Sequence, residues 1–94
     1  MQVMTLVVRL KPEKSTTARQ RRLSIESIVD TIHRHFNVSI ADIGLDAPNA
    51  EIILAATCVG RSRGKVRDVL DRVAEALCSY PGTAPANPPE FLSH

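Results

Sequence analysis

The sequence predicts an α+β fold in which three strands and two helices follow one another in the order β-α-β-β-α. Apolar residues recur at i, i+3, i+4, i+7 and i+11 in residues 25–36 and again in residues 66–77, the spacing of a helix with one buried face. Residues 2–10, 38–45 and 50–59 instead have the two-residue period or the unbroken apolar character of strands.

The first strand is expected over residues 2–10, because its apolar residues alternate. One face carries Met4, Leu6, Val8 and Leu10, and the other carries Val3, Thr5, Val7 and Arg9. Pro12 cannot donate a ladder hydrogen bond, so the strand should end before it. Hydroxyl side chains follow, and we expect the first helix to begin near Thr17 and to end near Phe36 and Asn37.

The second strand is expected over residues 38–45, with one irregularity. The side on which its apolar residues fall changes halfway, and a bulge near Ala41 and Asp42 would explain the change. Residues 46–49, with the sequence DAPN, indicate a turn. The third strand, residues 50–59, is apolar on both faces and should therefore be central in the sheet.

The second helix follows a short basic segment, residues 60–65 (GRSRGK), which we call the basic turn. Ser62 is the expected cap of this helix, and residues 80–82 (YPG) should stop it. Residues 83–94 are rich in proline and small side chains, which predicts a flexible tail. We therefore expect a single domain over residues 1–82, followed by that tail.

This element order is a split βαβ pattern followed by a second helix, the ferredoxin-like arrangement, in which the helices cover one face of the sheet. A right-handed crossover places the third strand beside the first. In the usual arrangement a fourth strand follows the second helix and lies outside the first strand. Pro85, Pro88 and Pro89 predict that this strand is missing or irregular here, which would leave the first strand with an unpaired edge.

Composition excludes several classes of protein. The 94 residues are 44% hydrophobic and 23% charged, which is typical of one small folded domain and not of a disordered chain. No apolar run approaches the ~20 residues of a membrane span, and no signal-peptide cleavage site is evident, so we expect a cytoplasmic protein. Cys58 and Cys78 match no CxxC spacing and are expected to be reduced core residues.

No group of residues supports catalysis, so we expect no enzyme, no cofactor, no metal site and no small-molecule substrate. His33 and His35 are two positions apart and point to different sides of a helix, so they cannot bind one metal ion together. The basic turn resembles a phosphate-binding loop, but its GxxxGK spacing is one residue short, and Val66 stands where a hydroxyl residue would bind magnesium.

The distribution of basic residues favours an RNA partner. They gather at the first helix and before the second, although the net charge is only +2. None of the three aromatic residues falls in an expected strand, which argues against base stacking on the sheet and favours contact with the phosphate backbone. The predicted nucleic-acid-binding residues are Arg19, Arg21, Arg22, Arg34, Arg61, Arg63 and Lys65.

The sheet face opposite the helices is not polar, and this predicts self-association. A soluble monomer rarely exposes a large contiguous apolar surface, so another copy, a different partner, or Phe91 and Leu92 of the tail should cover it. We expect a homodimer first, and the unpaired edge of the first strand offers a further contact between copies. The predicted interface residues are Val3, Thr5, Val7, Ile53, Ala55 and Thr57.

Residues 17–43, TARQRRLSIESIVDTIHRHFNVSIADI, resemble the signature of the YlxP-like family, small bacterial domains of unknown function. That signature runs approximately SLKxKRxxxxSLxxRxxxxFNVSxAEx, and FNVS at residues 36–39 matches it directly. The segments AEIILAATCVGRS and VLDRVAEALCSYP are similar too, so the likeness covers most of residues 1–81. The chain departs from the family at Ala18, where the family has Leu, and in the tail, where the family has an apolar final strand.

The resemblance implies a small ferredoxin-like protein without established enzymatic activity, usually encoded near translation and ribosome-maturation factors. Together with the basic residues, it leads to the hypothesis of an RNA-binding or ribosome-associated accessory factor. The alternative hypothesis is a homo-oligomeric protein-protein interaction scaffold that binds no nucleic acid.

Overall fold

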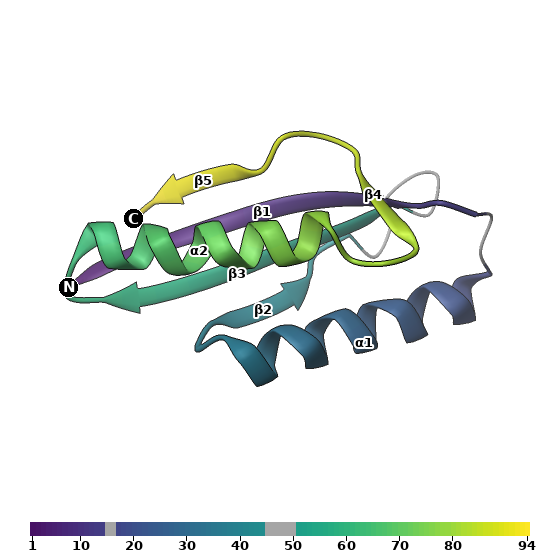
Figure 1. The fold of residues 1–94 in the computed structure, drawn as a ribbon, viewed down its shortest axis with the longest axis horizontal. Helices are drawn as coiled ribbons and strands as arrows, with labels where there is room; N and C mark the ends of the chain where they lie inside the picture. Colours follow the sequence, from purple (N-terminus) through teal and green to yellow (C-terminus); the bar gives the residue numbers. More distant parts are fainter. Residues whose placement is uncertain (15–16, 45–50) are drawn as a thin grey trace.

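The computed structural model describes residues 1–14, 17–44 and 51–94. Two helices pack on one face of a five-stranded antiparallel sheet, a mixed α+β arrangement consistent with the ferredoxin-like fold that the element order predicted (Figure 1). The elements are β1 (Gln2–Pro12), α1 (Ala18–His35), β2 (Ser39–Asp42), β3 (Ile52–Gly60), α2 (Arg63–Cys78), β4 (Thr83–Pro85) and β5 (Glu90–Ser93). The predicted fold class is confirmed.

The strands lie in the order β2-β3-β1-β4, and β5 also pairs with β1, so that β3 is an inner strand as predicted. One row of paired residues crosses four strands. Leu92 of β5 lies opposite Thr5 of β1. Thr5 lies opposite Thr57 of β3, which in turn lies opposite Ser39 of β2. Figure 1 shows these four strands side by side, and directly paired residues point to the same face of the sheet.

Residues 83–94 form part of the sheet, which corrects two predictions. We expected a flexible tail and an unpaired edge on β1, whereas β4 pairs with residues 10–12 of β1 and β5 pairs with residues 4–7. The prolines permit this pairing, because Pro88 and Pro89 lie in the link between the two short strands and Pro85 is the last residue of β4. The fourth strand is therefore present but interrupted, and it covers much of the outer edge of β1.

The helix caps agree with the sequence. The Thr17 hydroxyl accepts a hydrogen bond from the backbone N–H of Gln20 at 3.1 Å, and the Gln20 side chain accepts one from the Thr17 N–H at 2.9 Å. This reciprocal pair is a capping box, and it begins α1 at the expected position. The helix ends at His35, followed by Phe36 in an extended conformation. Ser62 caps α2, also as expected.

Two strand boundaries differ from expectation. β1 continues to Pro12, which lies opposite Thr83. Pro12 has no backbone N–H to donate, but because it is the last residue of the strand, the ladder loses no other hydrogen bond. β2 is shorter than predicted, and its register with β3 is continuous from Ser39 to Asp42, so the described part of β2 contains no bulge. The apolar pattern changes there because Ile43 is not buried, with 56% of its surface exposed. Leu45 and the predicted turn at residues 46–49 lie outside the described residues.

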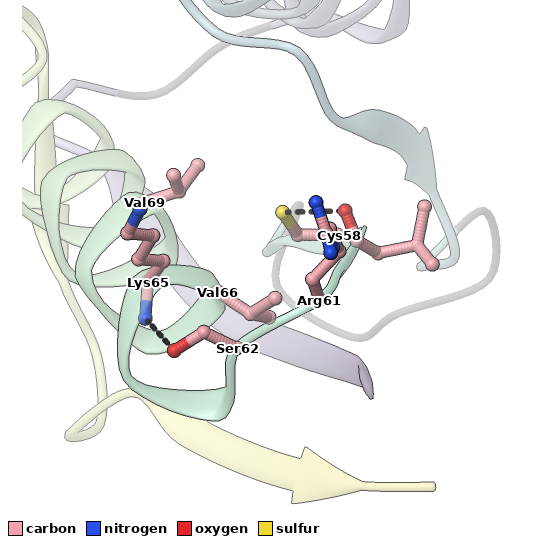
Figure 2. Close-up of a pocket in the computed structure, with 8 residues that line it drawn as sticks. Cys58, Arg61, Ser62, Lys65, Val66 and Val69 are labelled. Atoms are coloured by element: carbon pink, nitrogen blue, oxygen red, sulfur yellow. Dashed lines mark hydrogen bonds between the residues drawn. The ribbon is translucent and has the colours of Figure 1, made fainter. Parts of the chain in front are cut away.

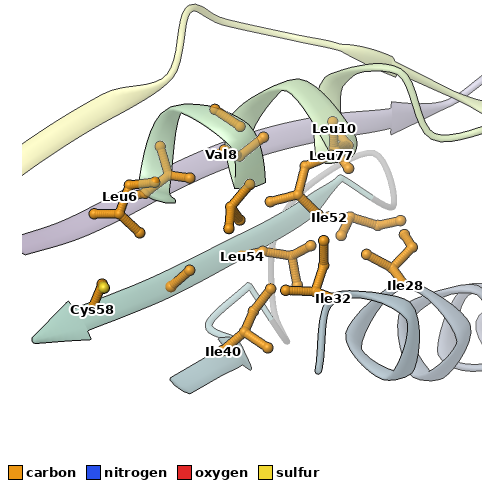
Figure 3. Close-up of a cluster of buried hydrophobic side chains, with 14 of the residues drawn as sticks. Leu6, Val8, Leu10, Ile28, Ile32, Ile40, Ile52, Leu54, Cys58 and Leu77 are labelled. Atoms are coloured by element: carbon orange, nitrogen blue, oxygen red, sulfur yellow. The ribbon is translucent and has the colours of Figure 1, made fainter. Parts of the chain in front are cut away.

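The core lies between the helices and the sheet (Figure 3). No polar or charged side chain of the described residues is buried in it, so the core needs no internal hydrogen-bond partners. Burial of each large apolar side chain contributes about 1.5–3 kcal/mol before the loss of chain entropy is subtracted. The largest fully buried side chains are Leu6, Leu10, Ile28, Ile32, Ile52, Leu54, Leu70, Leu77, Val8 and Val73.

The structure also bears on the expectations for the two cysteines and for membrane-spanning segments. Cys58 and Cys78 are free thiols, the first buried in the core and the second half-buried at its periphery. Burial raises the pKa of the Cys78 thiol above its usual range. No helix in residues 1–14, 17–44 and 51–94 is long and apolar enough to cross a membrane.

Candidate nucleic-acid interface

The basic turn, residues 60–65, joins the end of β3 to the start of α2. Gly60 is needed where the turn passes close to the helix, since a Cβ at this position would lie 2.8 Å from Cγ2 of Val66. The Ser62 hydroxyl accepts the backbone N–H of Lys65 at 3.5 Å, and the Ser62 carbonyl accepts that of Val66 at 3.1 Å. These bonds hold the turn against the first turn of α2.

Three cationic side chains of the basic turn are exposed, namely Arg61, Arg63 and Lys65. They surround the N-terminal end of α2, whose first turn contains no acidic residue. The backbone N–H groups at the start of a helix carry a partial positive charge, which here adds to the three side-chain charges. This end of α2 is therefore electrostatically suited to an anion such as a phosphate group.

A hollow of about 350 Å³ lies beside the basic turn (Figure 2). Its polar lining comes from Arg61, Ser62 and Lys65, and Cys58, Val66 and Val69 contribute apolar surface. Among the residues that the structure describes, no histidine or carboxylate lines this hollow, so it presents cations and a hydroxyl but no general base. Its chemistry suits the binding of a negatively charged group better than proton transfer.

Arg21, one of the predicted nucleic-acid-binding residues, is bonded within the chain. Its guanidinium donates hydrogen bonds to the carbonyl oxygens of Gly44 at 2.9 Å and Glu51 at 3.0 Å, and it lies 3.7 Å from the Asp42 carboxylate. Only 14% of the side chain is exposed. Arg21 therefore joins α1 to the residues on either side of positions 45–50, and its charge is largely compensated within the chain.

The other predicted basic residues are exposed but do not form one group. α1 and α2 run in opposite directions along the sheet, so that the two helix starts lie toward opposite ends of the molecule (Figure 1). The longest dimension of the molecule is 41 Å. Arg19 and Arg22 are thus separated from the basic turn, whereas Arg34 lies in the last turn of α1, where it forms a 2.7 Å ion pair with Asp30.

The sheet face away from the helices, which we call the open face, carries all six predicted interface residues. Its central hydroxyls are bonded within the chain, because Oγ1 of Thr5 lies 2.9 Å from Oγ1 of Thr57 and 2.8 Å from Nε2 of His94. The tail reaches only the margin of this face, where the His94 ring contacts Thr5. β5 lies beside β1, with Phe91 on the helix side, where its ring lies 3.6 Å from the Arg67 guanidinium carbon, and with Leu92 at the edge of the open face.

Sequence reasoning did not assign Ser39 to the open face, and it considered Leu92 as a tail residue that covers this face and not as part of the sheet. Both residues lie in the row that contains Thr5 and Thr57. Alternation within residues 90–94 was the available signal, but the prolines that precede it argued against a strand. Phe91 is likewise an aromatic residue in a strand, contrary to expectation, yet it faces the helices and so leaves the argument against base stacking intact.

In the described ranges 1–14, 17–44 and 51–94, no three His, Cys, Asp or Glu side chains lie close enough together to hold a metal ion. His35, on the exposed side of α1, places Nδ1 2.9 Å from the Thr31 carbonyl oxygen of its own helix. The arrangement with the most distinct binding chemistry is thus the basic turn with its hollow.

Comparison with known families adds one finding. A family model described as "Protein of unknown function (DUF503)" matches residues 3–85, which is most of the chain. A search of curated proteins returned no match.

Proposed function

The chain belongs to the DUF503 family, proteins of unknown function, and we propose from its surface chemistry that it is a non-enzymatic RNA-binding accessory factor. In this proposal the basic turn holds the phosphate backbone of a structured RNA. The observation that carries it is the grouping of Arg61, Arg63 and Lys65 around the start of α2 without an acidic residue in its first turn. The likeness to YlxP-like domains supports a place among ribosome-associated proteins.

The geometry favours contact with the backbone of RNA rather than with its bases. Several RNA-binding folds stack single-stranded bases on aromatic side chains of a sheet, and the open face carries no Phe, Tyr or Trp among the described residues. Arginine and lysine side chains at a helix start contact phosphate groups without reading sequence. We therefore expect strong dependence on salt and little dependence on RNA sequence.

Contacts within the chain also decide which arginine and lysine side chains are available to bind phosphate. Arg34 shares its charge with Asp30, and Arg21 is held by Asp42 and two carbonyl groups. No ion pair is formed by Arg61, Arg63 or Lys65 within the described residues. An arriving phosphate therefore displaces no carboxylate from these three side chains.

The test is a salt titration of RNA affinity. Fluorescence anisotropy with a labelled fragment of structured ribosomal RNA is measured for the wild type and for the triple variant Arg61→Ala, Arg63→Ala, Lys65→Ala. Loss of three phosphate contacts should weaken binding and reduce the slope of log K against log salt by about 2–3, because each contact contributes roughly 0.7–0.9. RNA binding that is absent at low salt, or unchanged in the variant, would overturn the proposal.

A charge-matched control removes three cations from other parts of the chain. Lys14→Ala, Arg19→Ala, Arg22→Ala leaves the basic turn intact while it lowers the net charge by the same amount. If the turn is the contact, this variant keeps most of the affinity and the salt slope. A loss confined to the control variant would instead assign RNA binding to the start of α1 and reject the basic turn.

The second candidate function is that of a homo-oligomeric interaction scaffold, and the open face is the observation that favours it. Val59, Ile43 and Leu92 expose 61%, 56% and 46% of their surfaces there. A monomer gains nothing from apolar side chains held in water, so such a face suggests a protein partner. RNA-free protein that self-associates through this face without any RNA affinity would favour the scaffold.

A further inference from the structure

The open face combines an apolar protrusion and a hollow in one row of the sheet. The row runs Leu92, Thr5, Thr57, Ser39 across β5, β1, β3 and β2. Leu92 stands at one end of the row with 46% of its surface exposed. At the other end is a hollow of about 460 Å³, where Ser39, Thr57 and Val59 contribute the open-face side of the lining, and His33, Asn37 and Val38 line it from α1 and the connection to β2.

We infer that two copies of the chain pack open face to open face, and that Leu92 of each copy enters the hollow beside Ser39 of the other. A two-fold axis parallel to the strands, midway between β1 and β3, exchanges the two ends of the row. Leu92 lies one and a half strand spacings to one side of this axis and Ser39 the same distance to the other. One rotation therefore aligns both protrusions with both hollows, as a self-complementary contact requires.

The middle of the row is already prepared for a dry contact. Burial of a hydroxyl without a partner is costly, but Thr5 and Thr57 satisfy each other at 2.9 Å and His94 supplies a further bond to Thr5. Alanine and threonine side chains keep the centre of the face flat, which suits sheets stacked about 10 Å apart. The Thr5 and Thr57 hydroxyls therefore need no polar group from the second copy.

Charge and size favour a second copy over an oppositely charged partner. The centre of the face, between β1 and β3, holds no charged side chain, and Arg9 at its margin is paired with Glu51 at 3.7 Å. Glu90 and His94, two residues to either side of Leu92, lie at the other margin of the same face. Nine paired residues of β1 and β3, with the shorter flanking strands, span roughly 400 Å² in projection. The protruding side chains enlarge the accessible area, which places the contact at the small end of stable interfaces and predicts micromolar affinity.

The first experiment measures the oligomeric state by sedimentation at rising protein concentration. The wild type should dimerise in the micromolar range. Leu92→Asp should raise Kd by at least about 100-fold, because the substitution occurs twice in a two-fold dimer and buries a charge each time. Leu23→Asp is the matched control, since Leu23 is 50% exposed but lies on α1, and it should leave Kd unchanged.

A second experiment tests the predicted register and does not rely on a destabilising change. Within one chain Ser39 and Leu92 are three strand spacings apart, about 14 Å, too far for a disulfide. The double variant Ser39→Cys, Leu92→Cys should therefore crosslink only between copies under mild oxidation, whereas Leu23→Cys, Leu92→Cys and the wild type should not.

Three results would overturn the inference. One is a wild type that stays monomeric up to about 1 mM, well above the expected range. The second is a Leu92→Asp variant, folded by circular dichroism, that dimerises as the wild type does. The third is a Ser39 and Leu92 cysteine pair that crosslinks no faster than the control pair.

Discussion

The guanidinium of Arg21 on α1 lies 3.7 Å from the carboxylate of Asp42 on β2, and both side chains are more than four-fifths buried. The Asp42 carboxylate also accepts the backbone N–H of Gly44 at 3.0 Å. Arg21 in turn donates to the carbonyl oxygens of Gly44 and Glu51. The pair thus connects α1, the end of β2 and the start of β3 through one network in which every bond involves a charged group.

Replacement of Arg21 should therefore reduce stability rather than RNA affinity. Arg21→Ala leaves two carbonyl groups and the Asp42 carboxylate with fewer partners, so we expect the free energy of unfolding to fall by about 1–3 kcal/mol. Urea denaturation measures the change. Arg22→Ala, at the exposed neighbouring position, should change it by less than about 0.5 kcal/mol. Equal effects from the two variants would mean that the Arg21 network contributes little.

A methyl group at Gly44 should be poorly tolerated. Gly44 is buried, and a Cβ there would lie 2.9 Å from both Cβ and Cγ1 of Ile53 on the neighbouring strand. Because strand backbone and a β-branched side chain cannot easily move apart, Gly44→Ala should cost about 1–3 kcal/mol in thermal unfolding. Gly64→Ala is the control, since its Cβ would meet only the Ser62 hydroxyl at 3.8 Å. A Gly44→Ala protein as stable as this control would contradict the close approach.

The C-terminal segment should contribute to stability, because it pairs with β1 instead of extending into solvent. The ring of Phe91 lies under the Arg67 guanidinium at 3.6 Å, a cation–π geometry worth about 0.5–1 kcal/mol at an exposed site. A double-mutant cycle with Phe91→Leu and Arg67→Gln should recover a coupling of that size from denaturation curves. Asp71→Asn, which removes the other partner of Arg67, checks that the coupling belongs to the ring. Zero coupling would indicate that β5 is not docked on α2.

The Cys78 thiol should react slowly with alkylating reagents at neutral pH. Burial raises its pKa, so less of the reactive thiolate is present than in the unfolded chain. The folded state holds the thiol proton more tightly, and the resulting stabilisation is complete below the unfolded pKa and is lost as pH rises through the folded pKa. Mass spectrometry of iodoacetamide labelling against pH measures the reactivity of the Cys78 thiol in the folded protein, and the same measurement in urea gives that of the unfolded chain. A labelling curve for Cys78 that matches the unfolded chain would contradict the shift.

Much of this fold was accessible from short-range patterns. Thr17 and Gln20 are three residues apart, and their capping box depends on nothing beyond α1. The buried stripe of α1 and the alternating face of β1 likewise follow from periods of a few residues. The candidate RNA site was predictable in part, because Arg61, Arg63 and Lys65 are close together in the chain, whereas the hollow beside them required the position of Val69 on α2.

The sequence by itself thus determines where the helices begin, which residues are buried and in what order the elements follow, because those properties depend on neighbours within about one helical turn or strand repeat. It does not determine the partners of Arg21, which lie 23 and 30 residues away, or the pairing of Leu92 with Thr5. Proline-rich composition argued against that last strand, and short ladders with prolines in the connecting residues formed nonetheless. Contacts of this kind arise only when the packed core brings distant segments together, which is why the contacts of Arg21 and the row from Leu92 to Ser39 across the open face emerge from the tertiary structure alone.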